Sequence, residues 1–165
     1  MTVNQELFNK IADVIEMEPD AYYQGDWACF SDDSVYCQSA EEADAKLDKL
    51  EHLCGTEHCI AGWAIVLTAK EQGLLSVARA ERYGFAQYSD GEIYVSPLDW
   101  LRGLADRTAG DKDFVRAGAT LLGLDREDAG HLFDGGWSPE SGLSVPEALR
   151  TRIFDAISAE WQRTV

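Results

Sequence analysis

Hydrophobic residues recur at three- and four-residue intervals along most of the chain, which is the spacing of an amphipathic helix. The first such stretch covers residues 4–18, with Asn4 as its candidate N-cap and Pro19 as its stop. Ser39 and Glu42 have the spacing of a capping box, so we expect a second helix to begin there. Both helices would bury one apolar stripe and turn their charged side chains to solvent.

A third helix is expected from Thr56, its candidate N-cap, to Gly73, where a positive backbone φ would end it. Gly62 falls in the middle of this helix, which indicates close packing at that point. The remaining helices are expected over 74–83, from Pro97 with Ser96 as cap, over 112–122, after Asp125, and from the capping box of Ser144 and Glu147. The last one would carry a stripe of Leu149, Ile153, Ala156, Ile157 and Trp161.

Residues 85–96 alternate in the manner of a β-hairpin, with Asp90 and Gly91 supplying the turn. Residues 19–38 have no clean period, and their interleaved aromatic side chains indicate a packed loop or short strands. The predicted fold is therefore mainly α (α+β), an irregular multi-helix single domain over residues 1–165 with one small β-hairpin near residues 85–95.

Composition adds one unusual feature, an excess of acid. The 165 residues include 14 lysines and arginines against 30 aspartates and glutamates, a net charge of −16. Such a charge argues against direct binding to DNA, RNA or anionic membranes. The acidic amino-terminal segment does not have the pattern of a signal peptide, and no apolar run approaches the roughly 20 residues of a membrane span. We therefore expect a cytoplasmic protein.

The acid is concentrated in the first third of the chain. Residues 1–57 contain 14 acidic side chains and three lysines. We expect these acids to form a surface for a basic host protein, such as one that binds nucleic acid, and a row of carboxylates on one helix face would imitate DNA phosphates. The candidate partner-binding residues are Asp32, Asp33, Glu41, Glu42, Asp44, Asp48 and Glu51. The alternative is that the acidity serves only solubility.

Cysteines and histidines gather in the same region, where Cys29, Cys37, Cys54 and Cys59 accompany His52 and His58. We expect no cofactor and inward-facing thiols that pack as small apolar groups. One alternative is zinc bound by candidate ligands among His52, Cys54, His58 and Cys59, with Cys29 and Cys37 available to complete an all-cysteine site. Cys54 and Cys59 have C-x4-C spacing rather than the usual C-x2-C. Another is a redox pair, with Cys59 near the start of a helix.

Catalytic motifs are missing from the sequence. It contains no nucleophile elbow, phosphate-binding loop or H-E-x-x-H pair. Residues 125–136 resemble a calcium loop, but Ala129 and Gly136 stand where ligands are required. We therefore predict a protein that is not an enzyme; the alternative is an enzyme whose pocket the sequence does not reveal.

Two segments carry a family resemblance. CGTEHCIAGWAIVL at residues 54–67 and LLGLDREDAGHLFD at 121–134 resemble a group of uncharacterised proteins from bacteriophages and actinobacteria. The shared signature is C-G-T-x-x-C-I-A-G-W/H-A, followed later by L-G-L and A-x-x-L-F-D. The resemblance implies a phage or prophage setting and places Cys54 and Cys59 in a shared sequence pattern, but it assigns no activity.

Overall fold

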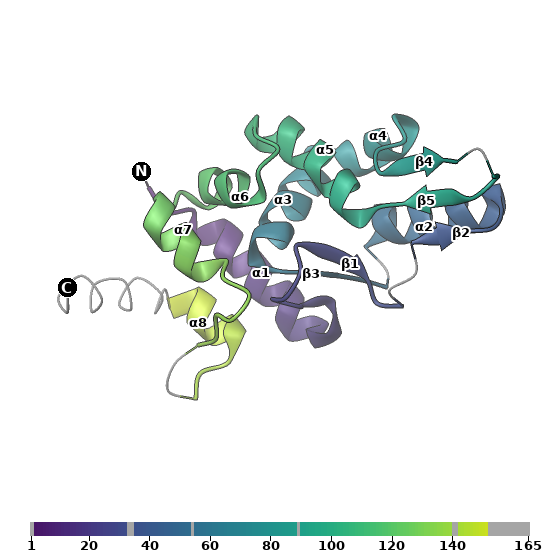
Figure 1. Ribbon diagram of the computed structural model, residues 1–165. Helices are drawn as coiled ribbons and strands as arrows, with labels where there is room; N and C mark the ends of the chain where they lie inside the picture. Colours follow the sequence, from purple (N-terminus) through teal and green to yellow (C-terminus); the bar gives the residue numbers. More distant parts are fainter. Residues whose placement is uncertain (1, 33–34, 54, 89, 140–141, 152–165) are drawn as a thin grey trace.

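The chain folds into a mainly helical structure with two small antiparallel sheets (Figure 1). The computed structural model describes residues 2–32, 35–53, 55–88, 90–139 and 142–151. The helices are α1 (Gln5–Met17), a 3-10 turn η1 (Pro19–Ala21), α2 (Ala40–His52), α3 (Ile60–Glu71), α4 (Leu74–Ala80), α5 (Pro97–Ala109), α6 (Phe114–Leu122), α7 (Arg126–Leu132) and α8 (Val145–Thr151).

Side-chain caps begin the helices where the sequence predicts them. The carboxamide of Asn4 accepts a hydrogen bond from the first turn of α1. At α2 the Ser39 hydroxyl accepts from the amide of Glu42. At α8 the capping box is reciprocal, because the Ser144 amide donates to the Glu147 carboxylate and the Glu147 amide donates to the Ser144 hydroxyl. These predicted helix starts are confirmed.

The strands extend beyond the predicted hairpin. That hairpin is confirmed as β4 (Phe85–Gln87) and β5 (Ile93–Val95), but β2 (Tyr36–Cys37) pairs with the other edge of β5. A second sheet joins β1 (Ala28–Phe30) to β3 (Thr56–His58). Strands β1 and β2 lie in residues 19–38, where a packed loop or short strands were expected. The sequence prediction missed β3, because a segment of three residues is too short to show alternation and is formed by pairing with a distant segment.

Two predicted helix starts are wrong. Thr56 does not cap a helix, because it lies in β3; Cys59 is the N-cap of α3, and its Sγ accepts from the Gly62 amide at 3.4 Å. The helix expected over 112–122 begins at Phe114, capped by Asp113. In the closing helix, Leu149 is buried as expected. The remaining stripe residues, Ile153, Ala156, Ile157 and Trp161, lie outside the described residues.

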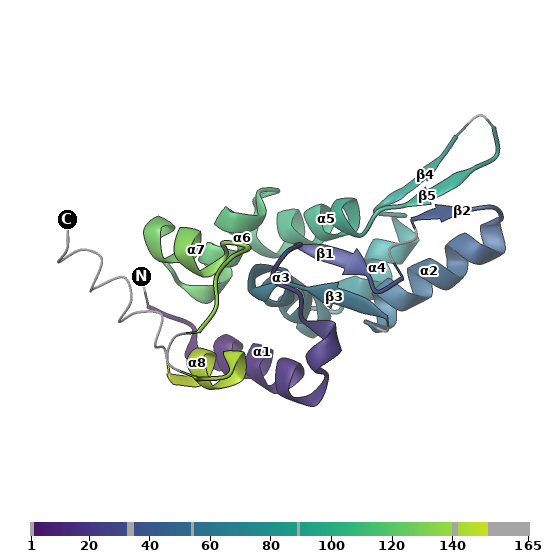
Figure 2. The same cartoon turned by 60° about the horizontal axis from the view of Figure 1, so that its bottom comes forward.

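Helix α3 is the centre of the molecule and packs against α1, α5 and α6. Its residues from Ile60 to Val66 are all buried, so it has no polar face in this stretch. At one end α2 packs against α4 and β5, and the β4–β5 hairpin projects from the body (Figure 2). Within the described ranges, none of the helices has the length and apolarity to cross a membrane.

Candidate functional site

The carboxylate row predicted on α2 faces an arginine of the same chain. Arg79, on α4, bonds to Asp48, lies 3.0 Å from a Glu51 carboxylate oxygen and lies 4.0 Å from Asp44. Hydrogen bonds to Asp48 and then Glu51 raise the pKa of the Arg79 guanidinium. Three of the predicted partner-binding residues are therefore brought together, but around an internal cation that the helix pattern alone did not reveal.

The other predicted acids are placed differently. Glu41 is exposed on the first turn of α2, whereas the Glu42 carboxylate accepts from the Gln38 amide at 2.7 Å. Asp32 lies 3.2 Å from the Lys46 ammonium and 3.5 Å from that of Lys49. Asp33 lies outside the described residues. The six of these residues that the structure describes thus form no single uninterrupted row.

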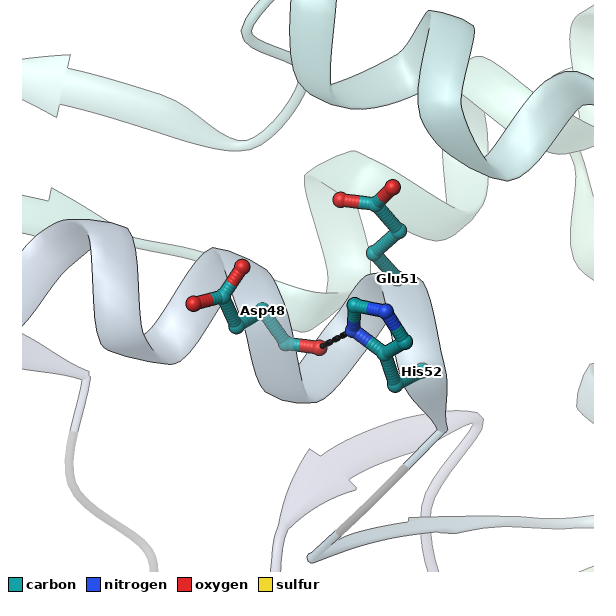
Figure 3. A group of neighbouring side chains, drawn as sticks. All are labelled: Asp48, Glu51 and His52. Carbon is teal, nitrogen blue, oxygen red and sulfur yellow. Dashed lines mark hydrogen bonds between the residues drawn. The ribbon is translucent and has the colours of Figure 1, made fainter.

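The last turns of α2 hold one group with the composition of a metal site (Figure 3). One ligand atom from each of Asp48, Glu51 and His52 lies within 4.8 Å of the others. The Nδ1 atom of His52 is 3.0 Å from the Asp48 carbonyl oxygen, so Nε2 remains for a ligand. A divalent cation bound here would compete with Arg79 for both carboxylates. The i, i+3, i+4 spacing of these residues was visible in the sequence, and the zinc alternative overlooked it.

Apart from His52, the zinc ligands considered from the sequence are not part of this group. In the part of the chain that the structure describes, Cys37, His58 and Cys59 do not form a cluster of three ligand atoms, and Cys54 lies outside that part. Cys37 is buried in β2, and burial raises the pKa of its thiol. Burial also raises the pKa of Cys59 to about 12, which opposes thiolate formation. Both thiols have the surroundings of apolar core groups.

The resemblance segment after Cys54 forms the corner between β3 and α3. Gly55 has a φ of 64°, a left-handed conformation that favours glycine. A Cβ added at Gly62 would lie 2.2 Å from the Trp27 carbonyl oxygen, so only glycine lets the two backbones approach. The indole Nε1 of Trp63 donates to the Ala21 carbonyl at 3.0 Å. These residues have structural roles in joining α3 to the small sheet.

His58 is the most perturbed group of this corner. It is fully buried, and neither ring nitrogen has a hydrogen-bond partner among the described residues. Its ring meets the Trp63 ring edge-on, with centroids 4.8 Å apart. Burial lowers the pKa of His58 to about 4, so the imidazole is neutral at physiological pH.

A groove that the sequence did not reveal lies between the end of α1 and the connection from α2 to β3. It consists of two adjoining cavities of about 360 and 260 Å³, which share Met17, Glu18 and Leu53 as lining residues. Leu53 has a φ of 57°, unusual for a branched apolar residue. The groove thus gathers residues from segments that are distant along the chain, and no local sequence pattern marks it.

Comparison of the chain with protein-family models, with curated proteins and with solved structures finds no match. The resemblance to phage and actinobacterial proteins stays a prediction that rests on two sequence segments. The function is therefore inferred from the geometry and charge of the molecule itself.

Proposed function

We propose that this protein is a non-enzymatic binding protein whose acidic amino-terminal third attaches to a basic surface of another protein. The resemblance to phage proteins supports a setting in a bacterial cytoplasm, with a host protein as the partner. Attraction between opposite charges would speed the encounter and make the affinity fall with salt. No cofactor or catalytic group is needed for this role.

The observation that carries the proposal is the shortage of internal cations for the acids of residues 1–57. Lys10 bonds to Glu6 and Glu71, and the other two lysines of this region bond to Asp32. Within the described residues, the cations that reach these acids from elsewhere are Arg79 and Arg150. The acids without an ion pair to a described residue are Glu18, Asp20, Asp26, Glu41, Glu42 and Glu57.

DNA mimicry is the concrete form of the proposal. Asp44, Asp48 and Glu51 converge on one guanidinium, which supports the idea that their spacing suits an arginine side chain. A partner's arginine would have to compete with Arg79 for these carboxylates. Glu41, at the start of the same helix, is exposed and free of such a competitor among the described residues.

The first test is capture from a bacterial lysate on the immobilised protein, followed by elution with increasing salt. We expect the captured proteins to be strongly basic and to dissociate as salt rises from about 0.05 to 0.5 M, because screening shortens the reach of the charges. Affinity of the purified partner that does not change over this range would overturn the proposal.

The second test asks whether the α2 row is the contact. Arg79→Gln removes the internal competitor, so we expect its affinity for the captured partner to rise by about threefold or more. Arg116→Gln is the matched control. It makes the same charge change at an arginine of α6, which pairs with Asp111 and not with the α2 row. Equal affinities for the two variants would show that the row is not the contact.

A further inference from the structure

We infer that the groove between α1 and the α2–β3 connection binds a peptide segment of the partner in which a basic side chain adjoins an apolar one. This inference rests on the proposed function and names its site and ligand chemistry. The two cavities form one continuous groove because Met17, Glu18 and Leu53 line both of them. None of the carboxylates of the α2 row lines either cavity, although His52, which lies beside Asp48 and Glu51, lines the smaller one.

The larger cavity suits a cation. Glu18 and Asp20 line it, and neither has an ion-pair partner in the described ranges. The described residues of its wall include no basic side chain. The hydroxyl-bearing residues Ser31 and Thr56 also line it. Thr56 is 2% exposed, and its hydroxyl oxygen has no hydrogen-bond partner among the described residues. Two carboxylates beside hydroxyl groups favour a ligand that donates several hydrogen bonds, as a guanidinium does.

The smaller cavity suits an apolar side chain. Its wall includes the apolar residues Val14, Leu53, Trp63 and Leu67 together with the polar residues Glu18, His52 and Lys70. The ammonium group of Lys70 has no ion-pair partner in the part of the chain that the structure describes, and it would repel a second cation. A peptide would therefore place its basic residue in the larger cavity and its apolar neighbour in the smaller one.

Met17 lines both cavities and is 81% exposed. A single exposed methionine is ordinary on a protein surface, but here it lines both halves of a groove. Its unbranched side chain adapts to partners of different shape. Leu53, held in its left-handed conformation, faces the same two cavities. Two of the three residues shared by the cavities are thus apolar, while the acids Glu18 and Asp20 supply the charge complementarity to a basic segment.

The test uses a fluorescent hexapeptide in which two arginines alternate with two leucines between terminal glycines. Anisotropy at low salt measures its affinity for the full chain. We expect Glu18→Lys combined with Asp20→Lys to weaken binding by about tenfold or more, because a charge-assisted contact becomes repulsive. Replacing the peptide's leucines by serines should also weaken binding, because the apolar cavity is then left unfilled.

The matched control is Asp106→Lys combined with Glu127→Lys, which makes the same charge change on exposed residues of α5 and α7. We expect this pair to weaken binding by no more than about threefold. If both double variants lose the same affinity for the peptide, the groove is not its binding site. The proposed function would still stand, because binding would then follow the overall charge of the protein. If the peptide does not bind to the wild-type chain, the inference that the groove binds a basic segment is also overturned. Lysate capture would then still test the proposed function separately.

A second measurement does not depend on the variants folding. Titration of the peptide into the isotope-labelled wild-type protein should shift the backbone amide signals of Met17, Leu53 and Gly55, which line the groove. Shifts confined to the exposed first turn of α2, around Glu41, would place the peptide on the carboxylate row and overturn the groove.

Discussion

At the residue scale, His58 shows how burial changes chemistry. In a strand that faces solvent, a histidine would change charge near neutral pH. Here the ring lies in the core beside Trp63 and Trp100, and burial lowers its pKa from 6.5 to about 4. Protonation would therefore place an uncompensated charge in the core.

This depressed pKa predicts a pH dependence of stability. The unfolded chain takes up a proton on His58 below about pH 6.5, whereas the folded chain does so only near pH 4. As the pH is lowered from about 6.5 to about 4, the free energy of unfolding should therefore decrease. This group contributes at most about 1.4 kcal/mol per pH unit to that decrease. Urea unfolding of the wild type and of His58→Leu at several pH values measures it. Identical slopes for both proteins would contradict the prediction, because carboxylate titration is common to the two.

At the element scale, the corner between β3 and α3 depends on close backbone approach. Gly62 lies in the first turn of α3, against the carbonyl of Trp27. Gly130, in the middle of α7, has no heavy atom within 4 Å of the place where a Cβ would stand. Gly62 and Gly130 therefore offer the same substitution within a helix in opposite environments.

Alanine should have opposite effects at these two glycines. Gly62→Ala forces the helix away from the small sheet and should destabilise the protein by about 1–3 kcal/mol or more. Gly130→Ala should stabilise by about 0.5–1 kcal/mol, because alanine has the better helix propensity. Thermal unfolding of both variants checks this, and a Gly62→Ala protein as stable as the wild type would show that the corner relaxes without loss.

At the scale of the whole molecule, the net charge of −16 dominates. Like charges repel in the compact state, and the ion pairs of Lys10, Arg79 and Arg150 offset only part of this repulsion. Salt screens the repulsion more than it weakens pairs that are in direct contact.

We therefore expect added sodium chloride to stabilise the protein. Raising it from about 0.02 to 0.5 M should increase the free energy of unfolding by about 1 kcal/mol, or the Tm by about 3 °C. Calorimetry over a salt series measures the effect. A Tm that falls with salt would mean that the internal ion pairs outweigh the repulsion.

The helical elements were predictable because their signals are local. Ser39, Ser96 and Asp125 cap their helices as the sequence indicated, since a cap and the amide it satisfies are only three residues apart. Thr56 misled the prediction because serine, threonine and cysteine can all cap a helix, and only the pairing of β3 with β1 moved the start to Cys59.

The sequence by itself determined the helix-rich class, the hairpin and the acidic first third, because periodicity, turn residues and charge are properties of neighbouring positions. The tertiary structure alone decided where the acids are neutralised, since Arg79 is far from α2 along the chain and reaches it only when α4 packs there. It also decided the groove, which forms where the ends of α1 and α2 meet α3 and β3. Contacts between distant segments depend on packing, which no local pattern specifies.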